Sequence, residues 1–332
     1  MTMHDPIPSP DKSSSTPSLI ERAADMYDFR NALNQGKPQV PDVPAVEAPT
    51  DDAIAAPVPP VAAPDPLASA PAPAPAAQPR PRSRLQPSLP VAVIDRDHLR
   101  ERAFIVPDGP VTSISEEFRI VKRRLLASIQ AEANAGLGAA AQRILICSAQ
   151  PNEGKTYSAI NLALSIATEQ DHDVLLVDAD FAKPSILSSL GIEGQRGLMD
   201  ALADANVEVE DCIIPTDIRG LSVLPAGRQT NTDSEYLASA RTIEVLARLT
   251  EGHPGRIVIF DSPPLLAASP AAALASHVGH ALMVVRADVT SERALKDALG
   301  LISDCNQIQL LLNGVKFSAS GRSFGSYYGY GE

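Results

Sequence analysis

Six apolar runs occupy the C-terminal two thirds of the chain, and segments with helical patterns separate them. Several runs show little alternation of apolar and polar positions, which is typical of strands that are covered on both faces. Helical stretches of ten or more residues lie between most of them, so the pattern predicts right-handed βαβ units. The expected fold class is α/β, with a doubly wound, mostly parallel sheet. The predicted strands are residues 143–149, 173–180, 221–227, 256–264, 281–288 and 308–315.

A separate helical pattern occurs near the N-terminus, in residues 18–33 (SLIERAADMYDFRNAL). Ser18 and Glu21 have the spacing of a capping box, and apolar residues at helical spacing would form one stripe. The segment is either a frayed helix without a function or a helix that docks on a partner.

Between these regions the composition changes sharply. Sixteen of the thirty prolines lie in residues 38–90, and no aromatic residue occurs between Phe29 and Phe104. Such a stretch buries too little apolar surface to offset the entropy of ordering, so a disordered, partly polyproline-II linker is expected. We therefore expect an N-terminal segment with a short helix, a linker, a domain with a single core, and a flexible tail. Their ranges are 1–37, 38–90, 91–316 and 317–332.

The net charge of −12 argues against nucleic acid as a partner, because neutralising phosphates requires a basic face. No apolar run reaches the ~18 residues that cross a bilayer, and no secretory signal is visible at the N-terminus. The three cysteines have no metal-ligand spacing and are expected in the core of a protein from the reducing cytosol. They are Cys147, Cys212 and Cys305.

The ends of the predicted strands carry the chemistry, because ligands of parallel sheets bind there. The first strand runs into AQPNEGKT, a Walker A loop with Ala149 at its first glycine position. Backbone N–H groups of such a loop and of the following helix cradle phosphate oxygens. Lys155 would reach the β- and γ-phosphates, and the Thr156 hydroxyl would ligate Mg²⁺. The sequence therefore predicts a nucleotide site for ATP and Mg²⁺.

Three carboxylates follow two other strands. Asp178 and Asp180 end the second strand, and Asp261 ends the strand IVIFD in a Walker B pattern. Helix capping would explain Asp180 alone, as Asp is common at such turns. Together with the phosphate loop, the three acids indicate a Mg²⁺–ATP site in which one carboxylate also accepts a proton.

The motifs SAQPNEGKT, LLVDADFAKP and IVIFDSPP, in this order, resemble the Walker A, Walker A′ and Walker B motifs of bacterial tyrosine kinases. The glycine-rich tail with its clustered tyrosines completes the resemblance. The SLIERAA, EEFRIVKR and YYGYG segments are similar to the tyrosine autokinases of exosortase-associated exopolysaccharide gene clusters. This resemblance implies an ATP-dependent protein-tyrosine autokinase that regulates exopolysaccharide synthesis or export.

The resemblance also implies roles for individual residues. Asp178 would be the base that activates the tyrosine hydroxyl, with Lys155, Asp180 and Asp261 as the other catalytic residues. Thr156, Asp180 and Asp261 would hold the metal directly or through water. Nucleotide-binding positions would be Asn152, Glu153, Gly154, Lys155, Thr156 and Tyr157.

Assembly and the substrate tyrosines follow from the same resemblance. Glu116, Arg119 and Lys122 match a motif through which such kinases form rings, and their spacing places them along one side of a helix. The glycine and serine residues of the tail would keep it mobile, and its tyrosines are expected to enter the site of a neighbouring subunit. The expected partners are other copies of the chain, a separate transmembrane activator of the chain-length-determinant type, and a tyrosine phosphatase. The expected location is cytoplasmic, at the inner membrane through that partner. The expected phosphorylation sites are Tyr327, Tyr328 and Tyr330.

The chain departs from the family pattern at three positions. Ala182 and Lys183 stand where an arginine is usual after the second acid, and Lys122 replaces the last arginine of the assembly motif. Lysine keeps the charge but lacks bidentate geometry. Tyr157 follows Thr156 where a small hydroxyl residue is commoner, and is expected to be a packing residue rather than a phosphorylation site.

Two alternatives stay open. A non-kinase ATPase of the partitioning or site-selection type shares this fold, but carries a lysine where this chain has Gln150, and gives the tyrosine tail no purpose. An inactive nucleotide-sensing module is the second alternative, against which the presence of Lys155 and all three carboxylates argues.

Overall fold

The computed structural model describes residues 89–136 and 138–315. The predicted N-terminal helix, all but the end of the linker, and the tyrosine tail lie outside the described residues. Within the described part, no helix combines the length and the apolar character that a membrane span requires.

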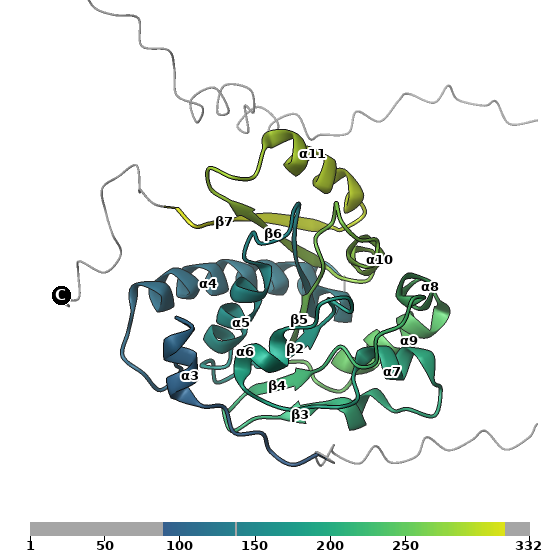
Figure 1. Ribbon diagram of the computed structural model, residues 1–332, viewed down its shortest axis with the longest axis horizontal. Helices are drawn as coiled ribbons and strands as arrows, with labels where there is room; N and C mark the ends of the chain where they lie inside the picture. Colours follow the sequence, from purple (N-terminus) through teal and green to yellow (C-terminus); the bar gives the residue numbers. More distant parts are fainter. Residues whose placement is uncertain (1–88, 137, 316–332) are drawn as a thin grey trace, which may run out of the picture. The chain divides into compact units, whose positions relative to one another are not determined.

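A seven-stranded sheet forms the centre of the described region, in the order β3-β4-β2-β5-β1-β6-β7 (Figure 1). All pairings are parallel except that of β3 with β4. The six predicted strands are confirmed, and β3 is an addition of two residues whose brevity left no periodic signal. The bounds are β1 Arg143–Ser148, β2 Asp173–Asp178, β3 Ile214–Pro215, β4 Leu221–Leu224, β5 Arg256–Asp261, β6 His280–Arg286 and β7 Gln307–Asn313.

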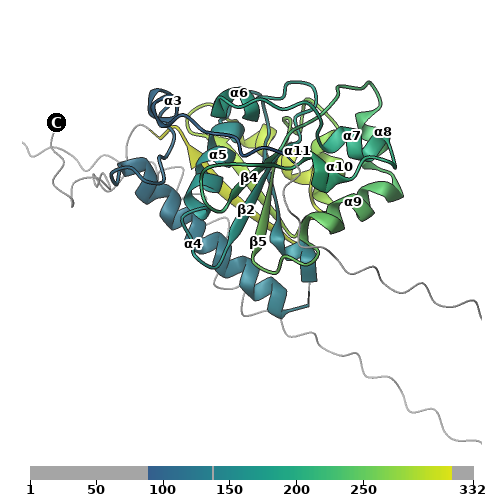
Figure 2. The same cartoon turned by 90° about the horizontal axis from the view of Figure 1, so that it is seen from below.

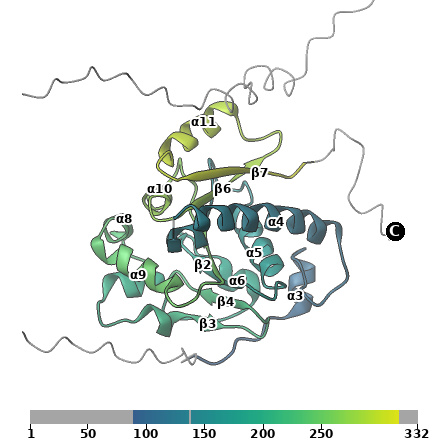
Figure 3. The ribbon, with the colours of Figure 1, turned by 180° about the vertical axis from the view of Figure 1, so that it is seen from behind.

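Helices cover both faces of the sheet, as Figures 2 and 3 show, so the doubly wound α/β prediction is confirmed. One apolar core packs beneath α3 (Arg96–Glu101), α4 (Ser113–Asn134), α5 (Lys155–Ile166) and α6 (Ile186–Leu190). The core on the other face packs beneath α7 (Leu198–Ala203), α8 (Asp233–Leu237), α9 (Ala240–Thr250), α10 (Pro270–Ala275) and α11 (Glu292–Leu301). Two short 3₁₀ turns, Gly138–Gln142 and Val209–Cys212, complete the described elements.

The inner strands β1, β2 and β5 are buried over nearly their whole length, which explains their unbroken apolar sequence. The three cysteines are buried and unpaired, so their expected core positions are confirmed. Burial raises the pKa of the Cys147 thiol to about 12, which keeps it protonated and unreactive.

The register of the central strands brings the predicted acids together. Asp178 at the end of β2 pairs with Asp261 at the end of β5, and Asp261 also pairs with Ile146 of β1. The phosphate loop leaves β1 two residues further on. Because the strands are parallel, the loop and the acids meet at one edge of the sheet.

Candidate active site

The phosphate loop depends on two residues with left-handed backbone. Asn152 has φ +62° and Gly154 has φ +98°, and α5 begins directly afterwards at Lys155. A Cβ atom at Gly154 would collide with the side-chain amide of Asn313. Only glycine combines this backbone conformation with this close approach, so the loop geometry requires the glycine of the Gly-Lys-Thr motif.

Glu153 is a buried part of the loop itself. Its Oε2 accepts a hydrogen bond of 2.8 Å from the Gln150 N–H, and its Oε1 accepts one from the Thr290 hydroxyl. Its carboxylate is thus committed to the loop, so Glu153 would contribute to nucleotide binding only through its backbone. This arrangement suits phosphate binding, because a Glu153 carboxylate that faced the phosphates would repel them.

Lys155 stands at the N-terminus of α5 and is 7% exposed. Burial lowers the pKa of its ammonium group, while the charges of Asp261, Asp180 and Glu153 act in the opposite direction. The lysine therefore lies among the predicted acids, as a phosphate-binding cation beside metal-binding carboxylates requires.

Asp178 is buried at the end of β2 and bound to backbone N–H groups. Its Oδ2 accepts from Ser185 at 2.8 Å and Ile186 at 3.0 Å, whereas its Oδ1 accepts only a longer bond of 3.3 Å from Asp180. Burial raises the pKa of Asp178 to about 6, although the three backbone bonds act to lower it. The carboxylate is thus held rigidly with one oxygen less engaged than the other.

Asp261 is fully buried, and neither of its oxygens has a hydrogen-bond partner among the described residues. Burial raises its pKa to about 7, and Thr156 and Lys155 offset this only in part. The Thr156 hydroxyl lies close enough to act on this pKa but makes no hydrogen bond of normal geometry to the carboxylate. A buried carboxylate without partners is costly unless a cation or water completes it. The site therefore fits a Mg²⁺ ion at Asp261.

The described residues do not provide a metal centre made of protein ligands alone, since no three His, Cys, Asp or Glu side chains gather closely enough. This suits Mg²⁺, which is usually held by one or two carboxylates together with phosphate oxygens and water. Asp261 and Thr156 are the residues best placed to hold it.

Asp180 lies half-buried beyond the strand end, where its Oδ1 accepts a hydrogen bond of 3.1 Å from the Lys183 N–H. Burial raises its pKa, and the charges of Lys155 and Lys183 oppose that shift. Ala182 and Lys183 are both exposed. The Ser185 hydroxyl lies 3.4 Å from the Thr156 hydroxyl and joins this turn to α5.

Tyr157 is turned away from the loop. Its hydroxyl donates a hydrogen bond of 2.8 Å to the Ala103 carbonyl, and its ring stacks on Phe104 with 5.5 Å between ring centroids. Burial raises the pKa of the phenol. The side chain is a packing residue, so of Tyr157 only the backbone is left for the predicted contact with nucleotide.

The three predicted assembly residues differ in their surroundings. Glu116 and Arg119 form an ion pair on α4 and are partly exposed. Lys122 is buried: its Nζ donates to the Ser165 carbonyl at 2.9 Å and pairs with Glu169 of the turn after α5. Lys122 thus fastens α4 to α5 within the chain, and the role of the three residues in assembly stays a prediction.

Three further polar residues contact the phosphate loop and were not predicted. Arg286, Thr290 and Asn313 follow or end β6 and β7, and they bind Asn152 and Glu153. The rule that identified the acids would also have found them. That rule is to read the residues at and just after the carboxyl ends of parallel strands.

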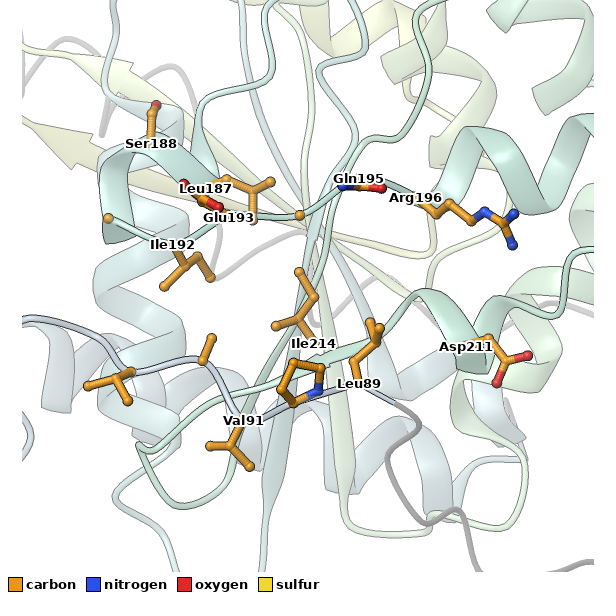
Figure 4. Close-up of a pocket in the computed structure, with 15 residues that line it drawn as sticks. Leu89, Val91, Leu187, Ser188, Ile192, Glu193, Gln195, Arg196, Asp211 and Ile214 are labelled. Carbon is orange, nitrogen blue, oxygen red and sulfur yellow. The ribbon is translucent and has the colours of Figure 1, made fainter.

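A separate groove with a volume of about 1080 Å³ is lined by residues of α6 and of the segment after it, and by none of the phosphate loop (Figure 4). Arg196 and Asp211 stand at one end, and Ser188 and Ile192 at the other. It carries none of the predicted site residues, so the chemistry is assigned to the strand ends and not to this groove.

Comparison with known proteins places the chain among related sequences. A profile of the family described as AAA domain matches residues 141–313, just over half of the chain. Tyrosine-protein kinase wzc of Salmonella typhimurium is 32% identical over 190 residues, which cover 56% of this chain and 26% of that protein. Tyrosine-protein kinase YwqD of Bacillus subtilis is 28% identical over 239 residues, which cover 71% of this chain and 94% of that protein. These relatives confirm the resemblance to bacterial tyrosine kinases.

The kinase domain of the Escherichia coli tyrosine kinase ETK has the same fold. It is 24% identical, with a TM-score of 0.53, and the match covers 69% of this chain and 90% of that domain. The chain spans about a quarter of the length of the Salmonella relative but almost the whole of the Bacillus one.

Proposed function

The chain belongs to the AAA domain family, and from that premise we propose that it is an ATP-dependent protein-tyrosine autokinase. The observation that carries the proposal is the pairing of Asp178 with Asp261 at neighbouring strand ends, beside a Gly-Lys-Thr phosphate loop. The relatives named as tyrosine kinases support the same activity.

Phosphate binding is assigned to the loop and to α5. The backbone N–H groups at the N-terminus of α5 and the Lys155 ammonium would hold the phosphates. Thr156 and Asp261 would hold Mg²⁺, which when bound neutralises charge on the β- and γ-phosphate oxygens. Without nucleotide, the charges of Lys155 and Asp261 compensate each other only in part. In the nucleotide complex, the phosphates would compensate the charge of Lys155 and Mg²⁺ would compensate that of Asp261.

Asp178 is assigned as the base. With a pKa of about 6 it is ionised at neutral pH, yet it is basic enough to take a proton from a phenol as the new bond forms. Its Oδ1, which has the weaker backbone contact, is the oxygen with capacity for that proton. The tyrosine oxygen then attacks the γ-phosphorus, its proton passes to Asp178, and ADP leaves with the electrons of the broken P–O bond.

The acceptors are proposed to be Tyr327, Tyr328 and Tyr330, which lie outside the described residues. Their support is their number in a glycine-rich end of a chain that is poor in aromatics. Tyr327 follows Asn313 by fourteen residues, a reach of at most about 50 Å when extended. That length allows the tail to enter its own site or a neighbour's, and we favour transfer between subunits.

The wider role is proposed from the resemblance alone. It comprises regulation of exopolysaccharide synthesis or export, a separate transmembrane activator, and a phosphatase that reverses the modification. The exosortase-associated subgroup belongs to the same proposal.

Radiolabelled ATP with Mg²⁺ tests the assignment on the purified full chain. We expect label from the γ-position to be retained on tyrosine of the protein. Release of free phosphate with no label on the protein would instead identify a non-kinase ATPase. To test transfer between subunits, an active chain that ends at residue 320 is mixed with the Lys155→Met chain, which keeps the tyrosines. Label on the Lys155→Met chain indicates transfer between subunits.

A further inference from the structure

Three polar side chains bind the phosphate loop from β6, from the segment after it and from β7, and β6 is the direct neighbour of β1 in the sheet. The Arg286 guanidinium donates a hydrogen bond of 2.8 Å to the Asn152 carbonyl, and the Asn313 amide donates one of 2.9 Å to the Glu153 carbonyl. The Thr290 hydroxyl donates to the Glu153 carboxylate. Two consecutive carbonyl groups of the loop and its buried acid are therefore all held from β6 and β7.

These three side chains form one connected unit, which we name the loop brace. Arg286 and Asn313 are paired residues at the ends of β6 and β7. The Arg286 N–H donates to the Thr290 hydroxyl at 2.9 Å, and the Ala287 N–H donates to the Asn313 carbonyl at 2.9 Å. Movement of one member therefore disturbs the other two.

The loop brace determines where the loop N–H groups point. In a trans peptide the C=O and the next N–H lie in one plane and point in opposite directions. With the Asn152 and Glu153 carbonyls turned toward the brace, the N–H groups of Glu153 and Gly154 are turned away from it. Neither N–H donates a hydrogen bond to a described residue, so both are available to phosphate oxygens.

The brace contributes little to the core. Arg286 is exposed, and Thr290 and Asn313 are only partly buried, so removing their polar groups uncovers little apolar surface. The loop, in contrast, has left-handed backbone at Asn152 and Gly154, a conformation that needs support for the non-glycine residue. The contacts thus act on the loop geometry more than on global stability.

We propose that Arg286, Thr290 and Asn313 are positioning residues that aim the loop N–H groups at the nucleotide phosphates. The inference rests on the proposed function in one respect, that the loop binds a nucleotide. It also joins the nucleotide site to the last described strand, since Asn313 stands two residues before the end of the described chain. The nucleotide site is therefore joined to β7, the strand that precedes the tail in the sequence.

The test uses Asn313→Asp in the full chain, which keeps the size of the side chain but replaces the donor with an acceptor. The matched control is Gln309→Glu, the same chemical change on the same face of β7, four residues away. We expect the Kd for Mg²⁺–ADP, measured by calorimetry, to rise about tenfold in Asn313→Asp, equivalent to about 1.4 kcal/mol. The control should change by less than about twofold.

Hydrogen exchange without nucleotide provides a readout that does not depend on the proposed function. Amides of residues 150–156 should exchange faster in Asn313→Asp and unchanged in Gln309→Glu, with melting temperatures within ~2 °C of the parent. Failure of the parent chain to bind Mg²⁺–ADP would overturn the proposed function, while the exchange comparison would still decide the positioning role. Normal exchange and normal affinity in Asn313→Asp would overturn the inference. If that variant does not fold, Thr290→Val, with the same expectations, decides instead.

Discussion

Asp178 and Asp261 are paired residues at the ends of neighbouring strands, yet their carboxylates are bound in opposite ways. Asp178 accepts three backbone hydrogen bonds, whereas both oxygens of Asp261 lack a partner among the described residues. Burial raises both pKa values, to about 6 for Asp178 and about 7 for Asp261. The backbone hydrogen bonds hold Asp178 rigidly, and its pKa leaves it ionised at neutral pH. Asp261, which has no partner among the described residues, is the carboxylate that a bound cation would stabilise most.

This difference predicts a pH-dependent stability that Asp261 causes. The pKa of Asp261 is about 7 in the folded chain and 3.8 ordinarily. Between these values the folded state keeps a proton that the unfolded state has lost, so stability declines as pH rises from about 4 to about 7. Asp261→Asn removes this term, so its melting temperature should exceed that of the parent increasingly toward pH 7. The difference between the two pKa values is about three units, which corresponds to ~4 kcal/mol. At about 2–4 °C for each kcal/mol in a domain of this size, the gain should reach roughly 10 °C near pH 7. If the melting temperatures of the parent and of Asp261→Asn differ by the same amount at every pH in this range, the raised pKa of Asp261 is contradicted.

Lys155→Met should abolish autophosphorylation while the chain stays folded. The substitution nearly keeps the length of the side chain but removes the charge that lies among Asp261, Asp180 and Glu153. Intact-mass measurement after incubation with Mg²⁺–ATP checks the loss of phosphate, and circular dichroism checks the fold. The control is Lys183→Met, an exposed lysine in the same region, which should keep most activity. Phosphotyrosine on purified Lys155→Met would mean that the site is misassigned.

Lys122→Met should lower thermal stability, although the position was predicted to serve assembly. The Ser165 carbonyl and Glu169 would lose their buried cation, a loss of about 1–3 kcal/mol. The hydrogen bond to Lys122 lowers the pKa of Glu169, so this contribution is present above the ordinary pKa of 4.5 and fades as pH falls below it. Differential scanning calorimetry at neutral and acid pH measures both effects. Arg124→Met, an exposed change on the same helix, should leave the melting temperature unaltered.

The triple change of Tyr327, Tyr328 and Tyr330 to phenylalanine should remove most incorporated phosphate without altering Mg²⁺–ADP affinity. The rings remain, and only the acceptor hydroxyls are lost. Phosphate incorporation by mass spectrometry and affinity by calorimetry are the measurements. Undiminished incorporation would place the acceptors elsewhere in the chain.

Phosphorylation of the tail should also weaken self-association. Each phosphotyrosine carries about −1.5 to −2 charges, so three add roughly five negative charges to a tail that must enter a site holding phosphates and carboxylates. We expect the phosphorylated chain to sediment toward monomer and the triple phenylalanine variant to self-associate. High salt should reduce the difference, since the Debye length is ~10 Å at 0.1 M. Identical sedimentation of the two forms would exclude this switch but not the kinase.

Deletion of residues 38–88 should leave kinase activity and melting temperature nearly unchanged in purified protein. This proline-rich segment has too few large apolar residues to contribute to a core. Thermal melts of the parent and the deletion variant are the comparison. A large fall in melting temperature would show that the segment packs on the domain.

The sequence by itself determined the fold class and the position of the phosphate loop and of the three acids at strand ends. Unbroken apolar runs are unmistakable where strands are covered on both faces, and the Gly-Lys-Thr loop needs its residues contiguous in the chain, between a strand and a helix. The same locality made Asp178, Asp180 and Asp261 recognisable as strand ends. These features are encoded over a few adjacent positions, so a linear reading recovers them.

Only the tertiary structure decided what each side chain does. A charged face on a helix and a lysine inserted beneath it have the same spacing in sequence, and Lys122 is buried because Ser165 and Glu169 supply partners from another helix. Strand order likewise brought Asp178 against Asp261, and Arg286 and Asn313 against a loop more than 130 residues earlier in the chain. Such contacts depend on which strands become neighbours in the sheet. The packing of the whole sheet determines that order, and no short stretch of sequence encodes it.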